Sequence, residues 1–257
     1  MSSKPTLVLV PGAWHIASTW NKISSLLEAQ GYKCSSLTLP SANSNPSATY
    51  LDDINAVRDA ITAETTQGRD VVLVVHSYGG HVGNSAIKGL TKPKQDSSVP
   101  TNKSSGFVVG VAMIASGFPI TGVAFLDGFG GKPPPYWKAD EETGFLDLLV
   151  DIRELFYHDL PIEEGEYWVS KLEKQALRPL TEGEHSYAGW KDVPVWFLAT
   201  TEDKALPFEA QKFFVQTARD AGADVTVREV ESSHSPMLSK PQETVDFLLE
   251  AAASFAK

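Results

Sequence analysis

The sequence predicts an α/β protein whose core is a mostly parallel sheet of about six strands flanked by helices. Short runs such as Val71–Val75 are apolar on both faces, which is typical of strands buried between two layers of helices. These runs alternate with segments whose apolar residues recur at helical spacing. Residues 119–190 break this alternation, and we expect them to form a helical cap.

The expected strands are short and apolar, and turn-forming residues follow them. The first strand covers Thr6–Val10 and ends at Pro11-Gly12. Five more segments follow the same pattern: Cys34–Leu39, Val71–Val75, Phe107–Ala115, Val193–Ala199 and Asp224–Val230. Parallel neighbours need long crossover connections, which the helical segments between these runs would supply.

The expected helices have one apolar face. In Trp20–Gln30 that face consists of Trp20, Ile23, Leu26 and Leu27, and Gly31 suits the helix C-terminus. The remaining helices are a segment marked by Ile54, Val57 and Ile61 and closed by Gly68, and then Gly79–Leu90, Phe208–Ala221 and Pro241–Phe255.

Composition excludes several classes of function. The chain has 257 residues, of which 42% are hydrophobic, and its net charge of −10 argues against nucleic acid or an anionic membrane as partner. A single cysteine, Cys34, allows no intrachain disulfide and no thiolate metal site. No apolar stretch reaches the roughly 20 residues of a membrane span, and Leu7–Val10 is too short for a signal-peptide core. We expect a soluble cytoplasmic protein, either a monomer or a homodimer.

Two segments interrupt the alternation of strands and helices. Lys92–Ser105 is rich in polar residues without apolar periodicity, and we interpret it as a mobile surface insertion. The second segment, 119–190, offers helices near Phe145–Tyr157 and Glu163–Leu177. We expect it to cover the carboxyl ends of the strands, where parallel sheets bind ligands. The core would then consist of residues 1–118 and 191–257.

Ser77 is the first candidate for chemistry. It lies between the apolar run Val71–Val75 and the glycines Gly79 and Gly80, in a strand–turn–helix context. Such a turn exposes a serine hydroxyl above the sheet edge and matches the pattern G-x-S-x-G, except that Val75 replaces the first glycine. A Ser-Gly turn after any buried strand would have similar residues, so the rest of the chain must decide.

A serine needs a base to take its proton and a carboxylate to orient that base. Asp203 follows the strand Val193–Ala199, and His234 follows Asp224–Val230. Ser77, Asp203 and His234 each lie just past the carboxyl end of an expected strand. Glu202 could also be the acid, but we prefer Asp203 because of its spacing to Pro207.

Other titratable residues receive structural interpretations. Asp127 is expected to cap a loop, His76 and His81 to pack near the elbow, and the remaining histidines to lie at the surface or in the lid: His15, His158 and His185. No histidine pair has convincing metal-ligand spacing with a carboxylate, so we expect no metal. Glycine-rich nucleotide-binding motifs are also missing from the sequence, so we expect no cofactor.

These motifs resemble the α/β-hydrolases, particularly the branch that holds plant salicylate-type methyl esterases, hydroxynitrile lyases and their fungal relatives. The matching pieces are Val8–His15 with Trp20, then His76–Gly80, Asp203 with Pro207, and His234 with Met237–Ser239. Two departures are Pro11, where a histidine is usual, and Val75 in the elbow. The resemblance implies an α/β-hydrolase fold and a Ser-His-Asp triad in this chain order.

Acyl chemistry also needs hydrogen-bond donors for the oxyanion of the tetrahedral intermediate. Tyr78 follows the nucleophile and would supply one backbone N–H. By resemblance, Ala13 in the first loop would supply the other. The sequence therefore predicts a serine hydrolase that cleaves a carboxylic ester or lactone.

Aromatic residues crowd the first loop and the lid, which favours a small apolar or aromatic substrate. The expected substrate-binding residues are Gly12, Trp14, Phe129, Tyr136, Trp137 and Trp168. Most buried aromatics only fill a core, so packing is the competing interpretation for each of them.

Three other functions stay open. The first is a hydroxynitrile lyase. The resemblance implies that lyases of this family have a threonine in the first loop and a lysine right after the catalytic histidine, whereas this chain has Gly12 and Ser235 there. A cofactor-free isomerase or cyclase of secondary metabolism could use the same pocket, and so could a non-catalytic ligand-binding receptor. Turnover of a chromogenic ester would separate the hydrolase from the last two.

Overall fold

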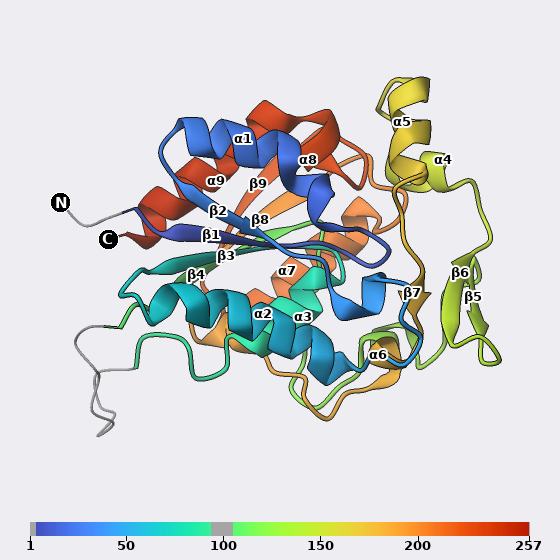
Figure 1. The fold of residues 1–257 in the computed structure, drawn as a ribbon, viewed down its shortest axis with the longest axis horizontal. Helices are drawn as coiled ribbons and strands as arrows, with labels where there is room; N and C mark the ends of the chain where they lie inside the picture. The colour runs from blue at the N-terminus through green and yellow to red at the C-terminus, as the bar shows by residue number, and fades with distance from the viewer. Residues whose placement is uncertain (1–3, 94–104, 257) are drawn as a thin grey trace.

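The computed structural model describes residues 4–93 and 105–256, so residues 94–104 of the expected insertion Lys92–Ser105 lie outside it. Its centre is a parallel six-stranded sheet in the order β2-β1-β3-β4-β8-β9 (Figure 1). The strands are β1 (Thr6–Val10), β2 (Lys33–Ser36), β3 (Val71–His76), β4 (Val108–Ile114), β8 (Val195–Thr200) and β9 (Val225–Val230). This confirms the predicted architecture. All six expected strands form, most within two residues of the expected bounds.

Helices cover both faces of the sheet (Figure 1). One face carries α1 (Asn21–Ala29), α8 (Pro236–Ser239) and α9 (Pro241–Phe255), and the other carries α2 (Tyr50–Thr65), α3 (Gly79–Ala86) and α7 (Phe208–Asp220). Gly31 and Gly68 follow α1 and α2 with φ of 78° and 75°, the left-handed conformation expected of a helix end. β2 is shorter than predicted because it lies at the sheet edge and pairs only with β1.

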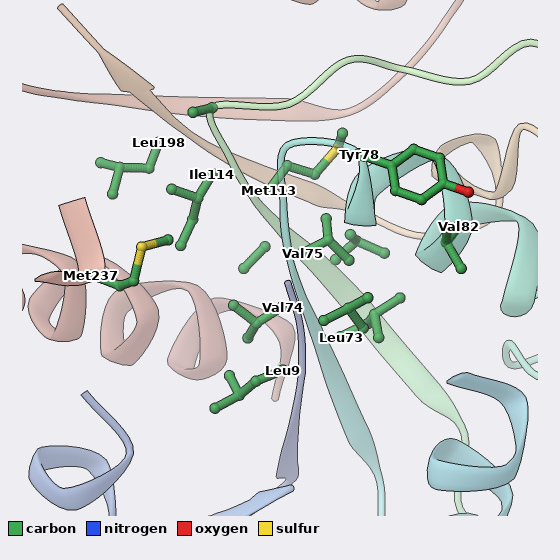
Figure 2. Packing of buried hydrophobic residues seen from close by; sticks show 14 of the residues in the cluster. Leu9, Leu73, Val74, Val75, Tyr78, Val82, Met113, Ile114, Leu198 and Met237 are labelled. Atoms are coloured by element: carbon green, nitrogen blue, oxygen red, sulfur yellow. The ribbon is translucent and has the colours of Figure 1, made fainter. Parts of the chain in front are cut away.

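The central strands are buried on both sides, as their uninterrupted apolar sequence predicts. In Figure 2, Leu73 and Val75 of β3 point toward the side of α3, while Val74 points to the opposite side, where Met237 lies. This alternation is the period of two expected of a strand. Burial on both faces fixes the register of β3 and therefore the height at which the chain leaves the sheet at Ser77.

The cap differs in part from the prediction. It contains a three-stranded antiparallel sheet, β5 (Trp137–Asp140), β6 (Phe145–Leu148) and β7 (Gln175–Ala176), and the short helices α4 (Ile152–Phe156), α5 (Ile162–Val169) and α6 (Arg178–Thr181). The expected helix Phe145–Tyr157 therefore begins only at Ile152, and the expected helix Glu163–Leu177 ends at Val169. Gly144, with φ of 75°, turns the chain so that β6 pairs with β5.

Short 3-10 helices connect the main elements: η1 (Ala17–Trp20), η2 (Pro40–Ala42), η3 (Phe125–Phe129) and η4 (Gly189–Lys191). The cap elements β5, β6, β7, α4 and α5 lie at the carboxyl end of the sheet (Figure 1). Within the described residues, no helix combines the length and the apolar character needed to cross a lipid bilayer.

Candidate active site

Ser77 occupies a strained turn between β3 and α3. Its φ is 52°, a left-handed conformation that residues other than glycine rarely adopt. The turn is close-packed, because a Cβ at Gly79 would collide with the carbonyl of Pro11 and a Cβ at Gly80 with the hydroxyl of Ser116. The Ser116 hydroxyl also donates a 2.7 Å hydrogen bond to the Ser77 carbonyl. This geometry is that of a nucleophile elbow.

The valine in place of the first elbow glycine is accommodated by α3. A Cβ at Gly83 would lie 2.6 Å from Cγ1 of Val75 and 3.0 Å from Cδ2 of Leu73. The Val75 side chain therefore fills space that Gly83 leaves empty. The glycine needed for close approach of strand and helix stands on the helix instead of the strand, and the elbow keeps its shape.

Asp203 and His234 form a buried pair on the loops after β8 and β9. Oδ2 of Asp203 lies 2.8 Å from Nδ1 of His234, and the two side chains are 0% and 3% exposed. A carboxylate can only accept, so Nδ1 carries a proton, and in the neutral form of the imidazole Nε2 is then the nitrogen that can accept one. Nε2 has no hydrogen-bond partner within the described residues, and His234 lines the same cavity as Ser77.

The Asp203 carboxylate is held by several further donors. Oδ2 accepts the hydroxyl of Thr200 at 2.8 Å, and Oδ1 accepts the backbone N–H groups of Ala205 and Leu206 at 2.8 and 2.7 Å. Glu202 instead presents its backbone carbonyl to Nε2 of His158 at 2.8 Å. The geometry thus places Asp203, and not its neighbour, against the imidazole. The supporting residues gave no sequence signal beyond the spacing to Pro207.

Two buried backbone N–H groups close to Ser77 in the cavity lining lack an acceptor in the part of the chain that the structure describes. Those of Ala13 and Tyr78 have no hydrogen-bond acceptor within the described residues, although both residues are buried and line the cavity. Buried N–H groups are nearly always paired in folded proteins, so two unpaired ones beside Ser77 are informative. They are the two donors that the sequence analysis predicts.

The first loop is fixed by residues of the cap. Nδ1 of His15 donates to the Ala13 carbonyl at 2.7 Å, and Nε2 accepts the Tyr157 hydroxyl at 2.8 Å. The side-chain carbonyl of Gln175 accepts the Trp14 N–H at 3.2 Å. Burial lowers the pKa of His15 to about 4, so the imidazole is neutral at pH 7 and keeps this pattern. Neither Tyr157 nor Gln175 is predicted as a site residue from the sequence, because each is distant in the chain from the loop residue that it contacts and carries no local motif.

His76 packs beside His234 at the elbow, whereas His81 on α3 lines the cavity. Nε2 of His76 donates to the His234 carbonyl at 2.8 Å, and the rings of His76 and His234 lie 4.6 Å apart. Burial holds the pKa of His76 well below its usual range and lowers that of His81 to about 4. Neutral His76 can therefore fix the backbone of His234 without placing a second charge beside it.

A buried carboxyl supports the elbow from the other side. Asp53 on α2 is 0% exposed, and its Oδ2 accepts the hydroxyl of Tyr78 at 3.0 Å while Oδ1 accepts the backbone N–H of Ser41 at 2.9 Å. Burial raises the pKa of Asp53 to about 6 and the pKa of Tyr78 well above its usual range. The Tyr78 hydroxyl is thus anchored to α2 through Asp53.

A cavity of about 770 Å³ opens at the carboxyl edge of the sheet. Six of the predicted site residues line it together with Ser77 and His234: Ala13, Trp14, Tyr78, Phe129, Tyr136 and Trp137. His15, which was given a structural interpretation from the sequence, lines it as well. Two predicted substrate contacts, Gly12 and Trp168, lie outside this lining. A Cβ at Gly12 would approach the Cβ of Ser77 to 2.9 Å, so this glycine makes room for the elbow.

Trp168 is buried on α5, where its ring packs against Tyr167 with the centroids 5.2 Å apart. Asp127 caps η3, since its carboxylate accepts the N–H of Ala124 at 2.9 Å, as the sequence predicts. Within residues 4–93 and 105–256, no cluster of three or more His, Cys, Asp or Glu side chains is placed to hold a metal ion.

The sequence profile of the alpha/beta hydrolase family matches residues 7–247. The chain belongs to this family. The resemblance inferred from the motifs is thereby confirmed for the family as a whole, from the first strand to the last helix.

Curated relatives of this α/β-hydrolase cover nearly the whole chain. Alpha/beta hydrolase nvfD of Aspergillus novofumigatus is 28% identical over 253 residues, 97% of each chain. Methylesterase 1 of Arabidopsis thaliana is 28% identical over 281 residues, which are 98% of this chain and 97% of the relative. Polyneuridine aldehyde esterase of Rauvolfia serpentina is 26% identical and covers 96% of this chain and 95% of its own.

Solved structures agree in fold. The crystal structure of polyneuridine aldehyde esterase superposes with a TM-score of 0.73 at 22% identity and covers 97% of this chain and 99% of its own. Tomato Methylketone Synthase I reaches a TM-score of 0.73 at 20% identity, with 98% and 99% covered. At these identities the likeness establishes the α/β-hydrolase fold and leaves the reaction to the site itself.

Proposed function

We propose that this chain is a serine hydrolase that cleaves a carboxylic ester or lactone of a small apolar or aromatic molecule. The observation that carries the proposal is the buried Asp203–His234 pair, because the imidazole of His234 belongs to the same cavity as the strained Ser77. The esterases among the relatives support the same class of reaction.

The chemistry follows from these groups. The Ser77 oxygen attacks the carbonyl carbon while Nε2 of His234 takes the hydroxyl proton, and Asp203 stabilises the imidazolium that forms. The N–H groups of Ala13 and Tyr78 stabilise the oxyanion. Collapse of the intermediate breaks the ester bond, and His234 returns the proton to the departing alcohol.

A water molecule then releases the acyl group from Ser77, and His234 again acts first as base and then as acid. His234 takes a proton from a water molecule, whose oxygen attacks the acyl carbon of the Ser77 ester. The second tetrahedral intermediate releases the carboxylic acid and restores the serine hydroxyl. In a lactone the alcohol and the acid stay joined, and the product is a hydroxy acid.

The cavity wall supports an apolar substrate. Most of the surface that lines the cavity is apolar, and six of its side chains are aromatic residues of the first loop and the cap: Trp14, Phe125, Phe129, Tyr136, Trp137 and Phe156. An apolar wall excludes water and strengthens each hydrogen bond made to the reacting carbonyl.

Turnover of a chromogenic ester tests the proposal. Ser77→Ala is expected to lower kcat by about 10⁴- to 10⁶-fold with an unchanged melting temperature, since the hydroxyl carries the reaction and not the packing. A phosphonate reagent is expected to label Ser77 alone. The control Ser25→Ala, on the exposed face of α1, is expected to keep full activity.

Labelling at another residue, or an active Ser77→Ala, would refute the assignment. An intact protein without turnover or labelling would instead indicate a receptor or a cofactor-free isomerase or cyclase. Release of cyanide from a cyanohydrin would identify a lyase.

A further inference from the structure

The cavity extends well beyond the residues around Ser77. Its lining continues along Gly117–Thr121, which follows β4, and along Tyr187–Asp192, which precedes β8. It then reaches α7, where four residues take part, Phe213, Phe214, Thr217 and Ala218, and ends at Ala221 just after that helix. We call the part of the cavity between these three segments the distal arm. No step of the proposed reaction uses it.

The polar groups of the distal arm are already occupied by the protein. The Thr121 hydroxyl accepts the N–H of Ala188 at 3.1 Å, and the Thr217 hydroxyl donates to the carbonyl of Phe213 at 2.9 Å. The Trp190 indole donates to the carbonyl of Pro119 at 2.7 Å. The Trp190 N–H is thus fully used, and each threonine hydroxyl already has one protein partner.

The charges of the distal arm are also engaged. The Asp192 carboxylate accepts the hydroxyl of Tyr187 at 2.8 Å, and this bond raises the pKa of that hydroxyl. The ammonium of Lys191 lies 4.9 Å from the ring centroid of Trp190 and is exposed to solvent, where water screens its charge. A ligand group in the distal arm would meet mainly carbon.

Two exposed apolar side chains stand at this arm. Ile120 is 61% exposed and Phe213 is 66% exposed, and both line the cavity. Single exposed apolar residues are common, but two that border one cavity, continuous with a reactive serine, offer apolar area to whatever enters it. The end of the cavity near Ser77 differs, because the N–H groups of Ala13 and Tyr78 are free there.

We propose that the distal arm is a subsite for an uncharged, extended apolar group of the substrate. The inference rests on the proposed function and adds a substrate class: esters or lactones with a long alkyl or fused-ring portion that carries no charge at its far end. The lining of the arm is mainly carbon, so a charged end held inside it would lose its hydration without gaining a matching partner, which is costly.

Binding to Ser77→Ala tests the subsite without turnover. Calorimetry would compare two series of intact esters, methyl alkanoates from acetate to octanoate and alkyl acetates from methyl to octyl. In one of the two series, each added CH₂ is expected to tighten binding roughly two- to threefold, since burial of a CH₂ contributes about 0.8 kcal/mol when complete. A flat response in both series would overturn the proposal.

Phe213→Ser in the same background locates the effect. It is expected to weaken octyl or octanoate binding about fivefold relative to the methyl member of that series. The control Ile162→Ser removes an apolar side chain that is 64% exposed on α5 and outside the cavity lining, and no change is expected. Equal losses for short and long esters, or equal effects of the two variants, would contradict the assignment.

A charged analogue tests the second half of the proposal. Monomethyl suberate, which ends in a carboxylate, is expected to bind at least tenfold more weakly than methyl octanoate. Equal or tighter binding would mean that Lys191 recognises an anion and that the subsite is not apolar in function. Failure of the proposed hydrolase would appear separately, as binding in these series without turnover by the wild-type chain.

Discussion

The sheet edge and the cap above it are built differently. At the edge, Ser77 and Asp203 follow strands that are buried on both faces, and His234 follows the outermost strand, β9. Close contacts at Gly79 and Gly80 leave the elbow no freedom. The cap consists of short strands and helices and exposes large apolar side chains, among them Leu149, Val150, Ile162 and Tyr167. The edge can hold reacting atoms in place, whereas the cap offers a surface that can vary.

The two regions are nevertheless joined at the catalytic loops. The Trp14 indole donates to the Leu146 carbonyl at 3.1 Å, and the Ser233 N–H donates to Oδ2 of Asp159 at 2.9 Å. These bonds reach the loops that carry Ala13 and His234. A cap substitution can therefore slow the reaction by displacing a loop, so kcat and substrate preference must be measured separately.

The largest expected effect lies at the edge. Asp203→Asn is expected to lower kcat/KM about 10³- to 10⁴-fold, because an amide can donate to Nδ1 and so favour the wrong tautomer of His234. Glu202→Gln is the matched control and is expected to stay within threefold of wild type, since its carboxylate has no bond to the imidazole. Steady-state kinetics with one chromogenic ester decides, and an exchange of the two effects would show that Glu202 is the acid.

The packing of the elbow can be disturbed by a substitution that leaves Ser77, Asp203 and His234 unchanged. Gly83→Ala is expected to destabilise the fold by about 2 kcal/mol, because the new Cβ would lie 2.6 Å from Val75. The double variant Val75→Gly/Gly83→Ala moves the glycine to the position usual in an elbow and is expected to regain part of that loss. Urea unfolding measures both. Equal stability of the single and double variants would mean that α3 shifts and that the two residues are not coupled.

The same contrast governs how far the sequence could predict the molecule. The strand Val71–Val75 is apolar throughout, so burial on both faces and a parallel sheet follow from local sequence, and with them the sites of Ser77, Asp203 and His234. Phe145–Leu148 has no such signal. Its alternation fits a helix or a strand, and only pairing with Trp137–Asp140 decides.

The supporting contacts of the site are long-range for the same reason. Tyr157 meets His15 across 142 residues, and Gln175 meets Trp14 across 161. No short motif encodes such pairs, because the cap positions one partner and the sheet the other. Positions close behind a strand, as in Ala13 and Tyr78, predict part of the cavity lining, and the aromatic residues Phe129, Tyr136 and Trp137 of the cap predict another part.

Asp53 tests how firmly the elbow is anchored. Its pKa is raised from 3.8 to about 6 by burial, so the folded state holds the proton more tightly than the unfolded chain. The resulting stability is fully present below pH 4 and is lost as the pH rises through about 6. The free energy of unfolding of wild type minus that of Asp53→Asn is therefore expected to fall by about 2 kcal/mol between pH 4.5 and 7.

Taking the difference between the two proteins removes the opposite trend of buried histidines. His15 and His81, with pKa values lowered to about 4, make both proteins less stable as the pH falls below 6.5. Urea unfolding at four pH values measures the difference. A difference independent of pH, or one that grows with pH, would show that Asp53 is ionised throughout and that the Tyr78 hydroxyl is held by a charge.

The smallest expected effect is a change in substrate preference, which we expect for Trp137 of the cap and not for Trp168. Trp137 lines the cavity and lies with its ring centroid 5.3 Å from that of Trp14, whereas Trp168 is buried outside the lining. Trp137→Leu is expected to change the ratio of kcat/KM between a bulky aromatic ester and an acetate about tenfold, because it removes the wall that the bulky group contacts. Trp168→Leu is expected to lower stability by about 2 kcal/mol and to leave that ratio unchanged.

The ratio of kcat/KM between the bulky aromatic ester and the acetate is more informative here than kcat/KM for either ester alone. Both tryptophans pack inside the cap, and loss of either can loosen the bonds that reach Trp14 and Ser233, which would lower turnover of every ester alike. Only a group that touches the substrate distinguishes one ester from another. If Trp168→Leu shifts the ratio as strongly as Trp137→Leu, the cap selects substrates through its overall packing. The distinction between a sheet edge that reacts and a cavity wall that selects the substrate would then be wrong.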